Sequence, residues 1–268
     1  MVVVDRTFGA PGRGRDYVIH IALAPSGGEI GLPKIDGPPD AARPLVVIDA
    51  GHGGKDPGAG AGSLKEKALT LALAKALRDR LLEMGGIRVA LTRSDDSYLF
   101  LAERTGIARR LKADLFLSIH ADSTEGSLAS GATVYTLSEK GTNEVAQKLA
   151  VQENRADEIN GVKLTQTSDT VSAILIDLAQ RETQARSEEF AGLLLREGRG
   201  RIGFREGTVQ SAAFAVLKSP DLASVLFESG YINNGADAAR LMSEAGRGQF
   251  ADVTAGAIRA YFARQSAN

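Results

Sequence analysis

Two of the three histidines in this chain stand where they could bind a metal ion or transfer a proton. His52 follows the apolar run LVVIDAG, and His120 lies near the end of the run DLFLSIHAD. Two glutamates occupy comparable places, since Glu228 ends the run VLFE and Glu66 opens a long helical pattern. Imidazole and carboxylate groups are the common side chains of catalytic zinc sites and of general acid–base pairs.

The apolar runs alternate with helical stretches, and this alternation indicates the elements that position the four residues. Helices are expected at residues 66–84 and 101–111, and a last helix carries Phe250, Ile258 and Tyr261 on one face. Further strands are expected at GATVYTLS, FAVLKS and SVLFESGY. The pattern predicts an α/β fold: a single domain with a twisted, mostly parallel sheet flanked by helices on both faces.

The carboxyl ends of parallel strands meet at one edge of a sheet, so His52, His120 and Glu228 are expected to lie close together. Glu66 starts the first helix and should lie at the same edge. Two imidazoles, one carboxylate and an open position suit a catalytic Zn²⁺ ion. A histidine at a strand end is, however, more often a hydrogen-bonded structural residue than a ligand, so at this point both interpretations stay open.

Two other chemistries receive less support from the sequence. The glycines of AGHGG and DPGAGAG follow a strand, as phosphate-binding glycines do, but this loop satisfies neither GxGxxG nor GxxxxGK[ST]. A serine hydrolase of the elbow type would need GxSxG, which does not occur. The third histidine, His20, lies inside an alternating apolar stretch and is interpreted as structural.

The overall composition bounds the class of protein. With 268 residues, 43% hydrophobic and 24% charged, the chain is typical of one large globular domain. Its formal net charge of -1 gives no overall basic field, so no nucleic-acid partner is expected. The absence of cysteine excludes thiolate ligands and cysteine nucleophiles. No apolar run reaches the roughly 20 residues of a transmembrane helix, so no transmembrane segment is expected.

Four ordered motifs resemble a known family. They are VVIDAGHGGKDPGA, the KEK around Glu66, LFLSIHAD and SVLFESGYINN. Together they resemble the zinc-dependent N-acetylmuramoyl-L-alanine amidases that separate daughter cells at division, and the resemblance runs from about residue 45 to 262. It implies that Zn²⁺ is held by His52, Glu66 and His120, and that Glu228 is the catalytic residue. One departure is Ala50, which stands where the family usually has proline.

The resemblance also implies a substrate, a location and a domain organisation. The substrate would be peptidoglycan, cut at the amide between N-acetylmuramic acid and L-alanine, and the enzyme would act in the periplasm. Residues 45–268 would form the catalytic domain. Residues 1–44 hold a short expected strand at Tyr17–Leu23 and a Gly- and Pro-rich linker, and they could be the remnant of a preceding wall-targeting domain.

A charged, helix-forming stretch at about 140–200 interrupts the strands and is expected to be a helical insertion. In the family that this chain resembles, such an insertion is regulatory. The resemblance implies that Glu153 would coordinate the zinc ion in an autoinhibited state. A later helix would dock a protein activator of the inactive-endopeptidase-like (LytM-type) class through Leu175, Ile176 and Leu178. The alternative is a solvated charged helix followed by an ordinary packed one.

Two alternative functions are compatible with the same residues. A zinc-dependent peptidoglycan carboxypeptidase or deacetylase would need the same ligands, and only its products would differ. A non-catalytic cell-wall-binding module would bind glycan while Glu228 had no kinetic role.

Overall fold

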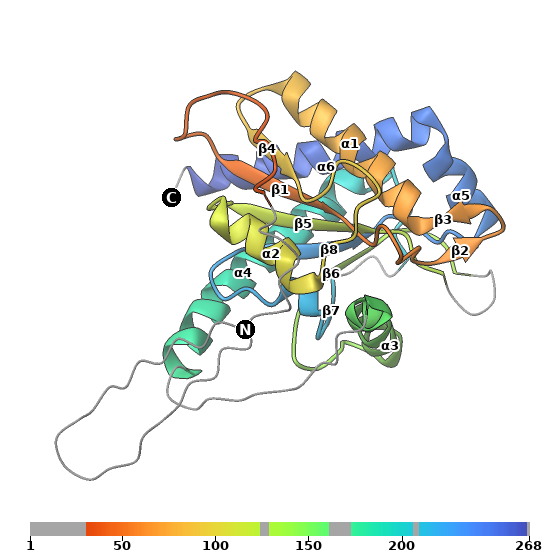
Figure 1. Cartoon of the computed structure of the whole chain (residues 1–268). Helices are drawn as coiled ribbons and strands as arrows, with labels where there is room; N and C mark the ends of the chain where they lie inside the picture. Colours follow the sequence, from red (N-terminus) through yellow and green to blue (C-terminus); the bar gives the residue numbers. More distant parts are fainter. Residues whose placement is uncertain (1–30, 124–128, 161–172, 206–208, 267–268) are drawn as a thin grey trace, which may run out of the picture. The chain divides into compact units, whose positions relative to one another are not determined.

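A six-stranded sheet forms the centre of the protein in a computed structural model, which describes residues 31–123, 129–160, 173–205 and 209–266 (Figure 1). The strand order is β4-β1-β5-β8-β6-β7. The strands are β1 (Leu45–Ala50), β4 (Arg88–Leu91), β5 (Leu115–His120), β6 (Thr133–Leu137), β7 (Gln210–Ala212) and β8 (Ser224–Glu228). A separate two-stranded ribbon pairs β2 (Gly60–Ala61) with β3 (Leu64–Lys65).

The sheet is mostly parallel. Strands β4, β1, β5 and β8 run in the same direction, whereas β6 is antiparallel to β8 and parallel to β7. Strands β1, β5 and β8 are buried along their whole length, as expected for parallel strands that are covered on both faces. The predicted fold class is therefore confirmed.

Helices cover both faces of the sheet. They are α1 (Glu66–Met84), α2 (Leu101–Arg110), α3 (Glu144–Asn154), α4 (Ala173–Gly198), α5 (Gly235–Met242) and α6 (Glu244–Gln265). Val46 and Ile48 of β1 point to a core shared with α1, α4 and α6. Val47, between them, points to the opposite core, which α2 and α3 cover. This alternation along one strand divides the hydrophobic residues between two layers.

One expected strand is wrong. The run FAVLKS forms a short 3-10 helix, η2 (Ala215–Leu217), and the edge strand β7 precedes it. A short apolar run has no periodicity that distinguishes a strand from a buried helical turn. The strand expected at Tyr17–Leu23 lies outside the described residues.

The stretch at about 140–200 is helical, in α3, η1 (Arg155–Asn160) and α4. The later part of α4 is not an appendage, because Phe190, Leu193 and Leu194 are buried in the main core. Upstream, the compact unit that contains the sheet begins at Pro33.

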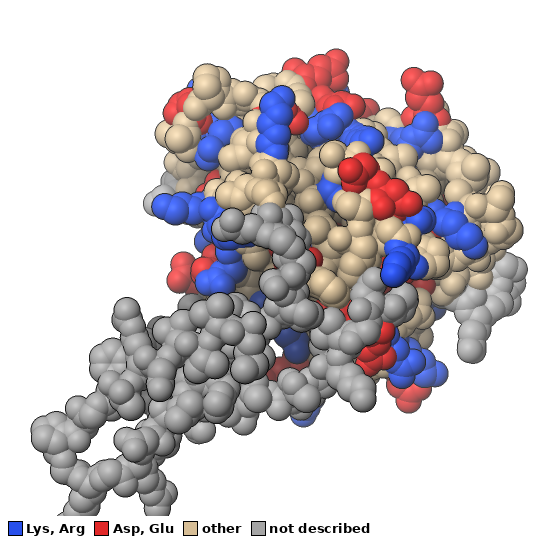
Figure 2. Space-filling view, viewed as in Figure 1, with Lys and Arg blue, Asp and Glu red and all other residues tan. Residues whose placement is uncertain are grey.

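The described helices and one face of the protein bear on membrane and charge properties. None of the helices in the described ranges combines the length and apolar character needed to cross a membrane. On the face shown in Figure 2, basic and acidic side chains are interspersed.

A buried arginine fixes the loop that follows β1. Arg104 of α2 forms an ion pair with Asp49 at 2.9 Å, and both side chains are almost fully buried. The same guanidinium donates to the carbonyl oxygens of Ala50 at 2.8 Å and of His52 at 2.9 Å. Thr92 donates to the same Asp49 oxygen, Oδ1, and Ser118 donates to Oδ2. Helix α2 therefore holds the polypeptide around His52 through one side chain.

Removing Arg104 should destabilise the protein strongly. Arg104→Ala leaves the buried Asp49 carboxylate without its cation, which typically costs about 3–5 kcal/mol. Urea unfolding followed by circular dichroism measures the change. The matched control is Arg109→Ala in the same helix, because Arg109 pairs with Asp221 at the surface. Exposed ion pairs contribute little to stability. Equal losses of unfolding free energy in the two variants would therefore contradict the structural role of the buried Arg104 pair.

Candidate active site

The loop after β1 holds His52 in an unusual backbone conformation. His52 has a φ of 60°, and Gly53 and Gly54 after it have φ values of 132° and 56°. A non-glycine residue in the left-handed region is uncommon and persists only where its surroundings enforce it. The bond from Arg104 to the His52 carbonyl and the paired backbone bonds between Gly53 and Asp56 provide that enforcement.

The imidazole of His52 lies among three carboxylates. Its Nδ1 is 2.8 Å from Asp56 Oδ2, and its Nε2 is 3.1 Å from Glu66 Oε2 and 3.5 Å from Glu153 Oε2. Burial lowers the pKa of His52, but the carboxylates of Glu66 and Glu153 outweigh it and hold the pKa well above its usual value. In the same contact, burial raises the pKa of Asp56, and the hydrogen bond with His52 reverses this and lowers it.

Glu66 lies between the two histidines. It is the first residue of α1, and backbone amides of Ala59 and Ala121 each donate to one of its oxygens at 2.8 Å. Burial raises its pKa, but the charge of His52 and the close approach of the His120 and His52 imidazoles outweigh this and hold the pKa well below the usual value. A Cβ at Gly58 would come within 2.6 Å of both Glu66 and the His52 ring, so only glycine fits there.

His120 ends β5 and faces the same point from the neighbouring strand. Its Nδ1 is 3.3 Å from Glu66 Oε1 and 3.2 Å from Glu153 Oε2. The ring lies edge-on to that of His52, with centroids 4.8 Å apart. A Cβ at Gly51 would stand 2.5 Å from the His120 ring, so this glycine provides the surface against which the imidazole packs.

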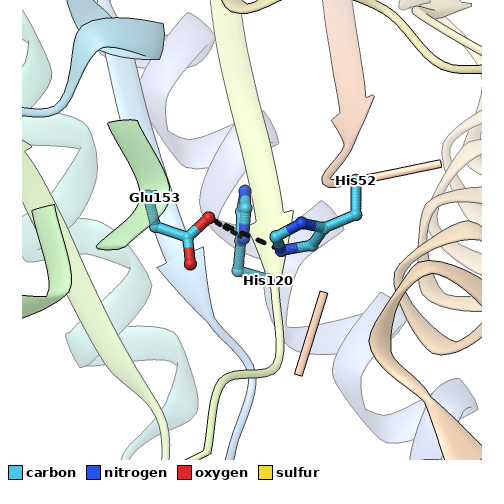
Figure 3. Close-up of side chains that lie close together, drawn as sticks. All are labelled: His52, His120 and Glu153. Atoms are coloured by element: carbon cyan, nitrogen blue, oxygen red, sulfur yellow. Dashed lines mark ion pairs between the residues drawn. The ribbon is translucent and has the colours of Figure 1, made fainter. Parts of the chain in front are cut away.

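Glu153 reaches the site from the end of α3. Figure 3 shows its carboxylate directed at both imidazoles. One ligand atom from each of His52, His120 and Glu153 lies within 4.8 Å of the other two, a spacing suited to a bound metal ion. Burial raises the pKa of Glu153 even though the charges of His120 and His52 oppose it.

Glu228 and Asp122 complete the buried acidic group. Glu228, at the end of β8, pairs in register with His120. The Asp122 amide donates to Glu228 Oε2 at 3.0 Å, while Glu228 Oε1 has no hydrogen-bond partner among the described residues. Burial, Asp122 and Glu66 raise the pKa of Glu228 well above its usual value. Burial, Glu153 and Glu66 likewise raise the pKa of Asp122 to about 7.

The donor set fits a divalent cation. His52 Nε2 and His120 Nδ1 are buried and make no hydrogen bond to any described residue. Both nitrogens face Glu66 and Glu153, so two imidazole nitrogens and two carboxylates converge. Nitrogen and carboxylate ligands in this combination suit zinc and related transition metals.

Most of this site was predicted from the sequence. His52, His120, Glu228 and Glu66 were predicted to meet at the carboxyl edge of the sheet, and the structure places them together. Glu153, expected in this site from the family resemblance, lies beside both histidines. The side chains of Leu175, Ile176 and Leu178 lie outside the described part of the chain.

Two acidic residues that contact these groups were not singled out. Asp56 stands four residues after His52 in the glycine-rich motif, and Asp122 ends LFLSIHAD. Their place in these motifs was the available signal. The buried role of Arg104 had no comparable signal, because it lies in an ordinary helical stretch.

The sequence is similar to known amidases. Residues 46–260 match the family described as N-acetylmuramoyl-L-alanine amidase. The N-acetylmuramoyl-L-alanine amidase AmiA of Salmonella typhimurium is 39% identical over 223 residues, which cover 82% of this chain and 77% of that protein.

Solved structures show the same fold. The amidase AmiC2 of Nostoc punctiforme matches with a TM-score of 0.56 and 30% identity, covering 82% of this chain and 98% of that chain. The catalytic domain of the amidase CwlV from Bacillus (Paenibacillus) polymyxa var. colistinus matches with a TM-score of 0.57 and 29% identity, and the match covers 82% and 98% of the two chains.

Proposed function

The chain belongs to the N-acetylmuramoyl-L-alanine amidase family, and we propose that it uses one zinc ion to hydrolyse the amide between N-acetylmuramic acid and L-alanine in peptidoglycan. The observation that carries the proposal is the convergence of two unpartnered imidazole nitrogens, from His52 and His120, on Glu66. These three residues would hold the metal. Zinc, when bound, supplies Lewis-acid polarisation of the scissile carbonyl.

Glu228 would transfer the proton. Asp122 holds one carboxylate oxygen of Glu228, and the other oxygen is not engaged by any described residue. Its raised pKa, caused by burial and by the neighbouring acids Asp122 and Glu66, brings it nearer to the range in which proton transfer is efficient at neutral pH. Glu228 would accept a proton from the attacking water and return it to the leaving amine of L-alanine.

Glu153 would regulate access to the same site. Its Oε2 lies 3.2 Å from His120 Nδ1 and 3.5 Å from His52 Nε2, where a substrate group would otherwise approach. A tethered carboxylate acts at high effective concentration, so it competes well with free substrate. The enzyme would therefore be autoinhibited.

Release of Glu153 would require a partner. A protein activator of the inactive-endopeptidase-like (LytM-type) class would bind the helix around Leu175, Ile176 and Leu178 more tightly in the open state, and this difference in affinity would shift the population. The activity belongs in the periplasm, where peptidoglycan lies, during cell separation.

Replacing Glu228 should separate metal binding from catalysis. Glu228→Gln keeps the shape of the side chain but cannot accept a proton, so the rate should fall by a factor of about 100 to 10,000 with zinc content unchanged. His120→Ala should instead lose zinc and activity together. Mass spectrometry of digested peptidoglycan and metal analysis measure the two effects. Near-normal turnover of Glu228→Gln, or full zinc content in His120→Ala, would contradict the proposal.

Removing the Glu153 carboxylate should activate the enzyme without a partner. We expect Glu153→Ala to raise basal peptidoglycan hydrolysis roughly 10- to 100-fold, the usual size of a regulatory coupling. The matched control is Glu158→Ala, since Glu158 is an exposed carboxylate in the same segment. Release of muropeptide stems from purified sacculi measures the rate. Equal rates for the unmodified enzyme and Glu153→Ala would rule out autoinhibition by this residue.

A further inference from the structure

Asp56 is a buried carboxylate to which the proposed reaction assigns no step. Its Oδ2 lies 2.8 Å from His52 Nδ1, and its Oδ1 accepts from the amide of Gly58 at 3.0 Å. Its own backbone is closed against Gly53 by two bonds of 3.0 Å. Both the backbone and the side chain of Asp56 are thus held by groups of the protein itself.

The contact decides which nitrogen of His52 faces the metal position. A carboxylate can only accept, so the Nδ1 of His52 carries the hydrogen in this pair. The lone pair available to a metal is then on Nε2, the atom directed at Glu66 and Glu153. Hydrogen bonding at one ring nitrogen commonly fixes the orientation of a metal-binding histidine.

The two histidines are oriented by different means. His120 presents Nδ1 to the site, and its ring is held by packing on Gly51. His52 presents Nε2 from a loop residue with positive φ. We propose that Asp56 is the positioning residue for His52, an inference that rests on the proposed role of His52 as a zinc ligand.

Zinc affinity and ring chemistry test this role. Asp56→Ala should weaken zinc binding about 10- to 100-fold in chelator competition, and Asp56→Asn, which keeps an acceptor, should restore part of it. Proton–nitrogen NMR of the zinc-loaded protein should show Nδ1 of His52 protonated, and this signal should be lost in Asp56→Ala. Asp96→Ala is the matched control, since Asp96 holds the same loop through the Gly54 amide without contacting His52.

The possible outcomes distinguish a failure of the proposed Asp56 role from a failure of the proposed amidase function. If His120→Ala loses zinc while Asp56→Ala keeps both normal affinity and the Nδ1 signal, the amidase assignment stands and the role of Asp56 is wrong. Equal weakening by Asp96→Ala would also overturn it, because the effect would then come from loop stability.

A separate set of contacts holds the segment that carries Glu153. The side chain of Gln152 donates to Asp122 Oδ1 at 2.9 Å. The Asn154 side chain donates to the carbonyl of Ala213 at 2.9 Å and accepts from the amide of Ala215 at 2.7 Å. These bonds fix the residues on either side of Glu153 to the strand-edge loops.

Asp157, which follows Glu153 in η1, binds the start of α2. Its Oδ1 accepts from the amide of Leu101 at 3.0 Å, and the Tyr98 hydroxyl lies 2.9 Å both from this oxygen and from the carbonyl oxygen of Ala156, to either of which it can donate. The residue before this helix, Phe100, offers no side-chain cap, so the buried Asp157 carboxylate takes that place at the positive end of the helix. The same helix carries Arg104, which binds the His52 carbonyl.

From these contacts we infer that Tyr98 and Asp157 form a latch that keeps Glu153 seated between the histidines. This second inference rests on the proposed inhibitory role of Glu153. The bonds at Asp157 connect the inhibitory segment to the helix that holds the histidine loop, so opening the segment must break them.

Tyr98→Phe tests the latch by removing one hydroxyl. The variant loses a hydrogen bond that exists only in the closed state, in which Glu153 lies between the histidines. Because the closed state is then less stable, amide hydrogens of α3 should exchange roughly tenfold faster, and basal hydrolysis should rise by a similar factor. Tyr261→Phe is the matched control, because the Tyr261 hydroxyl contacts Arg186 in a different part of the protein. It should change neither measurement.

The exchange measurement keeps the latch distinguishable from the autoinhibition proposal. Unchanged exchange in α3 of Tyr98→Phe would overturn the latch whatever the activity does. Faster exchange with unchanged hydrolysis would support the latch and count against Glu153 as the inhibitor.

Discussion

Both carboxylate oxygens of Glu66 are held by backbone amides, one before α1 and one after β5. This single buried side chain therefore connects the loop that carries His52, the start of the first helix and the end of the strand that carries His120. A buried carboxylate that lost either bond would bear a large desolvation cost, so the three elements cannot shift independently. The short distances from Glu66 to the two imidazoles follow from this arrangement.

The rest of the site is shaped by an excess of buried acid. Glu66, Asp122, Glu153 and Glu228 surround only two imidazoles, and burial together with mutual repulsion raises the pKa values of the last three. Such an arrangement is costly unless a cation offsets it. The proposed zinc would relieve the repulsion among the carboxylates and would bind the ring nitrogens of His52 and His120. One ion would therefore account for both the excess of buried acid and the imidazole nitrogens that make no hydrogen bond. The alternative to a bound cation is that one of the acids stays protonated, and this would suit Glu228 in its proposed role of transferring a proton.

The sequence predicted those features that depend on position within an element. His52, His120 and Glu228 follow strands, and parallel strands end at one edge, so their meeting could be predicted without any contact information. The run FAVLKS could not be assigned correctly, because four apolar residues suit a strand and a 3-10 turn equally. The contact of Tyr98 with Asp157 joins residues 59 positions apart, and no local pattern marks it. Asp56 lies inside a recognised motif, yet its proposed role depends on its contact with Nδ1 rather than Nε2 of His52, which only the folded structure shows.

The two ends of the helical stretch at about 140–200 are attached by different forces. The later part of α4 buries large side chains, Phe190 and Leu194 among them, and its removal would open the main core. Helix α3 buries Ala146, Leu149 and Ala150 in the second core, and Val145 and Val151 remain 46% and 44% exposed. Its end, which carries Glu153, is held by directional hydrogen bonds, each with a net contribution of about 0.5–1.5 kcal/mol. Under the proposed function, a partner that offered comparable contacts would replace those bonds, so the end of α3 would leave the site while the main core of α4 stayed packed.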